Sequence, residues 1–239
     1  GKLTSLKYPN NGQKVIGYNE GASTVTITDA ITGVYTYSYN ALLNVITQYT
    51  DPANNTITSN WDPSTRNNTG YQNPKSGNFA ATYWPNGSPK TITNAMGYMS
   101  YFEYDGANNL TRYAGPVKDL TNDGLINMDD VNFAIADGDY DSYMYDINNN
   151  RTSWTDREGH ARLYSYDSLG RIQVQSEPYG QTASYTYNLV SGQAETITDA
   201  LGYVKRYAYN EQGFLTKYTD AEGYITKFGI WAVSSLKIM

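Results

Sequence analysis

Aromatic and polar residues alternate along most of the chain with a period of two residues, as in the stretch YSYDSLGRI (164–172). Tyr164 and Tyr166 point to the same face of a strand, because side chains alternate between the two faces of a sheet. The next four residues turn the chain. We expect Ile172 and Val174 to return on the face of the tyrosines, with the intervening glutamines on the opposite face. The stretch therefore predicts a β-hairpin.

This hairpin recurs along the chain. The second aromatic residue of each pair, which we call the anchor, repeats every 21 or 22 residues, except for one gap of 41 residues. The anchors are Tyr18, Tyr39, Trp61, Tyr83, Tyr104, Tyr145, Tyr166, Tyr187 and Tyr209. Asp or Asn follows most anchors, and a second turn recurs as Thr-Asp-x-x-Gly, for example at 198–202. Asp, Asn and Gly are the residues that tight turns require.

A fixed period near 21 residues indicates a repeat architecture. Each unit is too short for a crossover helix, so it reads as strand, turn, strand, turn. The sequence thus predicts an all-β array of antiparallel hairpins over residues 1–239, with the anchor side chains buried on one face. The apolar run 228–233 leaves the repeat pattern, and we expect it to cap the sheet or to pair with another chain.

The repeated motif resembles the YD-repeat (Rhs-repeat) family, whose pattern is Tyr-x-Tyr-Asp-x-x-Gly-Arg-Leu. YSYDSLGRI matches it with Ile in place of Leu, whereas the copy at Trp61 lacks the following glycine. The family includes wall-associated and toxin proteins of bacteria, subunits of insecticidal toxin complexes, and teneurins. The resemblance implies a sheet that curves or spirals into a hollow shell, often around a second polypeptide. Residue 1 falls within a repeat, so we expect the chain to be a fragment of a longer protein.

The gap of 41 residues is explained by an insertion into one turn. Tyr218 lies five residues before the turn glycine Gly223, whereas Tyr113 lies 25 residues before Gly138. The difference of 20 residues has been added to a turn, where insertions are tolerated. We place an inserted loop and a short helix at residues 116–136.

The insert contains the stretch DLTNDGLINMDD (119–130). A calcium loop of twelve residues takes oxygen ligands from positions 1, 3, 5, 9 and 12 and a carbonyl from position 7, with glycine at position 6. Gly124 occupies position 6 here. The candidate calcium ligands are Asp119, Thr121, Asp123, the carbonyl of Leu125, Asn127 and Asp130. The stretch resembles one EF-hand-like half of a dockerin.

The run 131–136 after this loop predicts a short helix, with Phe133 and Ala134 or Ile135 turned inward. A complete dockerin has two such loops and binds a cohesin. The single loop here favours a structural role, in which calcium holds an insert that has too few apolar residues to fold alone. The alternative is an acidic surface turn without metal.

A second Asp-x-Asp-x-Asp set follows at Asp137, Asp139 and Asp141. It fits either a second metal site or the ordinary alternation along a strand. Negative charge is concentrated in the whole region, because residues 117–146 hold eight Asp and one Lys, a net charge of −7. The chain carries −6 in total, so the remainder is +1 and has no basic stripe for nucleic acid. The chain has no cysteine, which excludes disulfide and thiol chemistry.

No set of residues in the sequence indicates a catalytic site. The single histidine, His160, follows Gly159 in a turn, and we expect it to be an exposed strand residue. We therefore predict a non-enzymatic structural or scaffold segment of a secreted or cell-surface protein, stabilised by one calcium ion. Its expected partners are further repeat segments, identical subunits or an encapsulated polypeptide. Two alternatives stay open: a subunit of an extracellular assembly or filament, and an adhesion module whose tyrosines stack on glycans.

Overall fold

The computed structural model describes residues 2–8 and 12–229, which fall into two compact units that meet between Tyr140 and Asp141. The elements of unit 1 are β1 (Ser5–Lys7), β2 (Gln13–Asn19), β3 (Thr24–Thr28), β4 (Val34–Asn40), β5 (Val45–Thr50), β6 (Thr56–Trp61), β7 (Asn68–Asn73), β8 (Gly77–Tyr83), β9 (Pro89–Thr93), β10 (Met99–Tyr104), β11 (Leu110–Val117) and α1 (Met128–Asp137). The strands of unit 2 are β12 (Asp141–Tyr145), β13 (Arg151–Thr155), β14 (Ala161–Tyr166), β15 (Ile172–Ser176), β16 (Thr182–Tyr187), β17 (Ala194–Thr198), β18 (Val204–Tyr209), β19 (Leu215–Thr219) and β20 (Ile225–Lys227).

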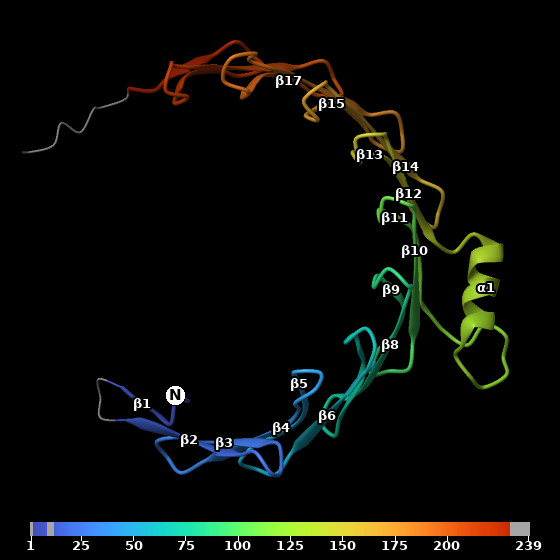
Figure 1. Cartoon of the computed structure of the whole chain (residues 1–239). Helices are drawn as coiled ribbons and strands as arrows, with labels where there is room; N and C mark the ends of the chain where they lie inside the picture. Colours follow the sequence, from blue (N-terminus) through green and yellow to red (C-terminus); the bar gives the residue numbers. More distant parts are fainter. Residues whose placement is uncertain (1, 9–11, 230–239) are drawn as a thin grey trace, which may run out of the picture. The chain divides into compact units, whose positions relative to one another are not determined.

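Every strand pairs antiparallel with the next strand along the chain, from β1 to β11 in unit 1 and from β12 to β20 in unit 2 (Figure 1). This confirms the predicted all-β array of antiparallel hairpins. The described part of the chain contains no helix that is long and apolar enough to cross a membrane, since α1 has ten residues. The cap expected from the run 228–233 lies mostly outside the described residues.

Short acidic side chains close the turns, as the motif predicts. Asp167 accepts the backbone N–H groups of Leu169 and Arg171 through Oδ1, both at 2.9 Å. Gly170 has a φ of 76°, a conformation that glycine adopts without steric cost. Asp199 makes the same pair of backbone hydrogen bonds in a Thr-Asp-x-x-Gly turn. These bonds fix the length of each turn and therefore the register of the strands that follow.

The return strand of this hairpin differs in phase from the sequence prediction. Gln175 faces Tyr164 across β14 and β15, and Val174 faces Ser165. Directly opposed residues share a face, so Val174 lies on the face opposite to the tyrosines and the prediction for it is wrong. The cause is a β-bulge before Tyr166, which places one extra residue in β15. Similar shifts precede the anchors Tyr39, Trp61, Tyr83, Tyr104, Tyr145, Tyr187 and Tyr209.

Buried apolar side chains gather where α1 packs on β10 and β11, which lie beside it in Figure 1. The cluster consists of Tyr101, Ala114, Val117, Val131 and Ala134. In the described part of unit 2, Ser153 is the one buried residue. The strands of each unit thus form one layer. In unit 1, α1 covers this layer at a single place, over β10 and β11.

The anchors are half-buried in this layer, and Tyr18 is 40% exposed. The expectation that they are buried is therefore wrong for the described structure. A single layer leaves both faces of a strand within reach of solvent, whereas full burial requires a second layer packed on the aromatic face.

Candidate functional site

The inserted loop begins after β11 and ends at α1. Asn127 is the N-cap of α1, and its side chain accepts the N–H of Asp129 at 2.6 Å. Asp130 returns the interaction by accepting the N–H of Asn127 at 2.9 Å. This reciprocal pair is a capping box, which satisfies two N–H groups that a helix N-terminus leaves free. The helix thus starts three residues before the predicted run 131–136.

Asp130 organises the loop from the inside. Asp130 is 0% exposed, and its Oδ1 accepts the backbone N–H groups of Leu120 at 2.7 Å and Thr121 at 2.9 Å. The N–H groups of Asn127 and Thr121 hold the pKa of Asp130 down at about 2. Three N–H donors stabilise the ionised carboxylate, so the site keeps its negative charge at neutral pH.

Asp119 supports the interpretation of the loop as a cation site. Its Oδ2 accepts the N–H of Gly124 at 2.9 Å, whereas its Oδ1 is buried and has no hydrogen-bond partner among the described residues. A buried carboxylate oxygen without a partner is costly unless a cation neutralises it. Asp123 also closes the loop, since its Oδ1 accepts the N–H of Leu125 at 2.8 Å. The oxygen donors and the left-handed Gly124, at φ 82°, fit a calcium ion.

The structure brings the predicted ligands into one loop, but it does not gather their carboxylates tightly. Asp130 is buried, whereas Thr121, Asp123 and Leu125 are exposed. Among the described residues, the one trio of His or carboxylate side chains with ligand atoms within 4.8 Å of one another is Asp156, Glu158 and His160. The hydrogen bonds within the loop therefore define its fold, and ion binding by the ligand set stays a prediction.

The predicted inward orientation of Phe133 is wrong. Phe133 is 53% exposed, whereas Val131 and Ala134 are 0% and 1% exposed. Residues three apart lie on one face of a helix, so burying Val131 and Ala134 turns Phe133 toward solvent. Ala134, the other residue of the prediction, does turn inward, and Ile135 packs at the margin of the cluster.

The second Asp-x-Asp-x-Asp set begins at the C-terminus of α1. Asp137 ends the helix, and Gly138 follows as a left-handed cap with φ of 85°. The N–H of Asp139 donates to Ala134 O at 2.8 Å, which closes the last turn. This backbone arrangement is a helix cap. The alternation along a strand that was the other explanation does not hold for Asp137, which is helical, and a second metal site stays an open alternative.

His160 has partners that the sequence did not reveal. Its Nδ1 lies 3.3 Å from Asp156 Oδ2, and its Nε2 lies 3.1 Å from the hydroxyl of Tyr179. The side chain is 41% exposed. The spacing Asp-x-Glu-x-His in 156–160 could have indicated the contact with Asp156, whereas Tyr179 belongs to the turn between β15 and β16, two turns further along the chain. These contacts join the turn 156–160 to Tyr179.

The anchors connect consecutive repeats through hydrogen bonds. Among the described residues, the anchors of at least five units donate to the backbone carbonyl of the residue fifteen positions earlier, at 2.6–2.9 Å. The pairs are Tyr18 with Leu3, Trp61 with Ile46, Tyr83 with Asn68, Tyr166 with Arg151, and Tyr187 with Ile172. The bond explains why Trp replaces Tyr at Trp61, since the indole Nε1 keeps a donor that phenylalanine lacks.

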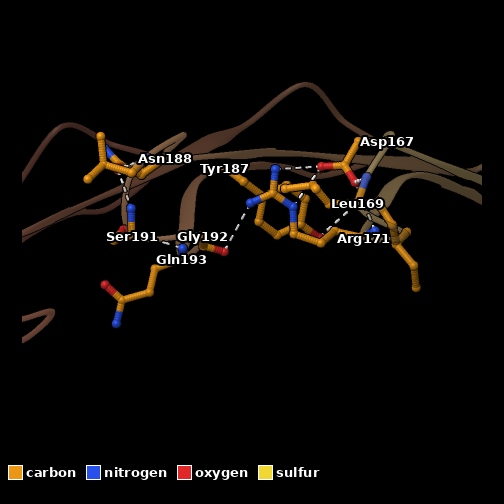
Figure 2. A network of polar contacts seen from close by, with 10 residues as sticks. Asp167, Leu169, Arg171, Tyr187, Asn188, Ser191, Gly192 and Gln193 are labelled. Carbon is orange, nitrogen blue, oxygen red and sulfur yellow. Dashed lines mark hydrogen bonds and ion pairs between the residues drawn. The ribbon is translucent and has the colours of Figure 1, made fainter.

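Arg171 adds a second connection between repeats, drawn in Figure 2. Its guanidinium donates to Asp167 Oδ2 at 2.7 Å and lies 4.4 Å from the ring centroid of Tyr187 in the next unit. It also donates to Gly192 O at 3.3 Å. The hydrogen bond from Arg171 is the main cause that holds the pKa of Asp167 below its ordinary value. The Gly-Arg dipeptide of the motif therefore joins its own turn to the following hairpin.

The hairpins and the contacts between them define a β-hairpin repeat protein. Residues 145–182 and 187–225 match the family model RHS Repeat. This match supports the assignment of the chain to the YD/Rhs-repeat family, to which its motif is similar. No curated protein matches the chain.

Small parts of several solved structures are similar in backbone to most of this chain. The crystal structure of TcdB2-TccC3 has a TM-score of 0.49 and 12% identity, over 95% of this chain and 14% of that chain. The crystal structure of TcdB2-TccC3-Cdc42 has a TM-score of 0.47 and 10% identity, over 92% and 15%. A Tc holotoxin pore from Photorhabdus luminescens has a TM-score of 0.33 and 14% identity, over 90% and 14%. The chain spans 14–15% of the length of these structures.

Proposed function

We propose that the chain is a non-enzymatic structural segment of a secreted or cell-surface YD/Rhs-repeat protein, in which its hairpins form part of a curved or spiralling sheet. The observation that carries this proposal is the bond from an anchor to the carbonyl of the preceding unit. Such bonds make each hairpin depend on its neighbour, as in other repeat arrays. The function of the chain is then to extend a continuous surface.

The missing core of unit 2 supports a role within something larger. Ser153 is its one buried residue in the described part, while its tyrosines are half-buried or exposed. A sheet is stable when its apolar face packs against another layer. Further repeat segments of the parent chain, identical subunits or an enclosed polypeptide would supply that layer. A subunit of an extracellular assembly is the second candidate, and the same observation favours it.

The proposed calcium ion serves the structural role. Asp119, Thr121, Asp123, Asn127 and Asp130 would hold it, together with the carbonyl of Leu125. The ion would supply a positive charge that crosslinks the loop and neutralises the unpartnered Oδ1 of Asp119. Because the loop leads directly into α1, its order bears on the docking of Val131 and Ala134 on the sheet.

Calorimetry tests the calcium part of the proposal. We expect the wild-type chain to bind one calcium ion, and Asp119→Ala to abolish this binding because it removes the unpartnered oxygen. Asp129→Ala is the matched control, since it removes a carboxylate of the same insert that is not a proposed ligand. Equal loss of calcium binding in both variants would show that the acidic segment attracts calcium by its overall charge and not through the proposed ligands.

Chelation tests whether calcium orders the insert alone or the whole chain. We expect EGTA to raise amide hydrogen exchange in residues 116–136 and to leave the β-strands protected. Unfolding of the entire chain in EGTA would refute this division of roles.

Amide hydrogen exchange also tests the dependence of one repeat on the next. Tyr166→Phe removes the hydroxyl that donates to Arg151 O. We expect faster exchange in the hairpin of Arg151 as well as in that of Tyr166, and unchanged exchange in β18 and β19. A change confined to β14, which carries the substituted residue, would contradict the proposal.

A further inference from the structure

The outer face of α1 combines negative charge with an exposed aromatic ring. Asp129, Phe133 and Asp137 are spaced four residues apart, so they lie on one side of the helix. All three are exposed, and Phe133 is 53% exposed. The helix rise places the two carboxylates about 12 Å apart, with Phe133 midway between them. Aromatic side chains are enriched at the centres of protein interfaces, and polar residues at their rims.

Three cations lie together on one face of the last strands of unit 2. Lys217 faces Lys227 across β19 and β20, and Arg206 faces Thr219 across β18 and β19. Strand residues two apart share a face, so Arg206, Lys217 and Lys227 all point to the same side. Each is exposed, and the described part of the chain provides none of them with an ion pair. Lysines directly opposite each other repel, which leaves this face in need of negative charge.

The size and spacing of the basic face match the acidic helix. Lys227 lies two strands across and two residues along from Arg206, a separation of about 12 Å. A depression of about 340 Å³ is lined by Arg206, Lys217 and neighbouring residues of β17, β18 and β19, with Glu195 among them. The two faces therefore share a spacing, in which about 12 Å separates the outer charges. The basic face also offers a depression on its Arg206 side.

We propose that two copies of the chain associate through these faces. Phe133 of one copy enters the depression beside Lys217 of the other. Asp129 and Asp137 pair with Arg206 and Lys227, in charge-assisted hydrogen bonds that exposed Lys and Arg form with carboxylates. The contact joins two different surfaces, so each copy keeps one free face and the association continues head to tail.

This inference rests on the proposed structural role, because it names the partner that such a segment engages. It is independent of the six calcium ligands proposed for the loop 119–130, since Asp129 and Asp137 are not among them. Its test measures the association of copies, whereas the test of the calcium proposal measures calcium binding by calorimetry. Failure of one is therefore distinguishable from failure of the other.

The test is sedimentation velocity of the whole chain in calcium buffer, with one variant for each face. The helix variant carries Phe133→Ala and Asp137→Lys, and a lysine at a helix C-terminus suits the helix dipole. The strand variant carries Lys217→Glu and Lys227→Glu. The control is Lys205→Glu. Lys205 precedes Arg206 in β18 and faces Ile197, so its side chain lies on the face opposite to that of Arg206. Circular dichroism confirms that every variant keeps its strands.

We expect wild type to associate beyond dimers with rising concentration, and each face variant alone to bind itself about tenfold or more weakly. An equimolar mixture of the two variants should form one-to-one dimers and nothing larger, because only one intact face remains on each. The Lys205→Glu control should behave as wild type. Wild type that stays monomeric overturns the proposal, and so does equal weakening by the control or a mixture that fails to pair.

Discussion

The hydroxyl of Tyr187 donates a hydrogen bond of 2.7 Å to the backbone carbonyl of Ile172. Ile172 is the residue that faces the preceding anchor, Tyr166, at the β-bulge of its hairpin. A bulge disrupts the hydrogen-bond ladder locally, and the next anchor supplies a donor at that point. One phenol thus joins the bulged end of one hairpin to the end of the first strand of the next hairpin.

Replacing Tyr187 by Phe should destabilise the chain by about 1 kcal/mol, the usual net value of one hydrogen bond. The ring would remain beneath Arg171, so the cation–π contact is preserved. Tyr185→Phe is the matched control, because the described residues offer the Tyr185 hydroxyl no hydrogen-bond partner. Urea unfolding of both variants measures the difference. Equal loss of stability in the two variants would show that the bond to Ile172 contributes nothing specific.

The ion pair of Asp167 with Arg171 should make stability depend on pH in the acid range. The pKa of Asp167 is lowered in the folded chain, chiefly by the side-chain hydrogen bond from Arg171. A lowered pKa means that the carboxylate contributes stability above the unfolded pKa of about 4, and that this contribution is lost as the pH falls through the folded pKa.

The comparison of wild type with Asp167→Asn isolates this charge, because asparagine retains the turn-forming oxygen. The difference in Tm should be full at neutral pH and should shrink as the pH falls below about 4. In an Arg171→Gln background, the difference in Tm caused by Asp167→Asn should be smaller and should depend less on pH. A difference that stays constant into strong acid would rule out the ion pair as its source.

The repeated hairpins could be predicted from the sequence because two local signals agree. Alternation with period two sets the strands, and Asp or Asn with glycine sets the turns, as Asp167 and Gly170 show. The face of Val174 could not be predicted, because the bulge before Tyr166 depends on pairing between strands. The outward position of Phe133 could not be predicted, because Val131 and Ala134, three residues apart, form the face of α1 that packs on the sheet.

The contacts between repeats could not be predicted from the sequence for a different reason. The motif identifies Tyr187 as an anchor, but its acceptor is a backbone carbonyl, which any residue carries. Likewise Arg171 is a motif residue whose partners belong to its own turn and to the next unit. Spacing predicts which side chains recur, whereas their acceptors depend on how far one hairpin is displaced along the next.

Asp130 should control the docking of α1 when calcium is removed. Its carboxylate accepts three N–H groups, and Asn at this position has one carbonyl oxygen and an amide donor that faces those same groups. In EGTA we expect Asp130→Asn to raise hydrogen exchange across α1, while Asp129→Asn leaves it unchanged. The wild-type helix should lose protection as the pH falls from about 4 toward 2, because the folded pKa is about 2. Retained protection in Asp130→Asn would assign the order of α1 to apolar packing alone.

The packing of α1 on the sheet should depend on Val131 and not on Phe133. Val131 is 0% exposed within the apolar cluster, and Val131→Ala removes two methyl groups and leaves a cavity, at a cost of about 2 kcal/mol. Phe133→Ala removes a larger side chain, but that side chain is 53% exposed, so the free energy of unfolding should change little. Hydrogen exchange of β10 and β11 in calcium buffer measures both variants. If Phe133→Ala were the more damaging substitution in dilute monomer, the ring would contribute to the fold of its own chain, and its assignment to an interface between copies would fail.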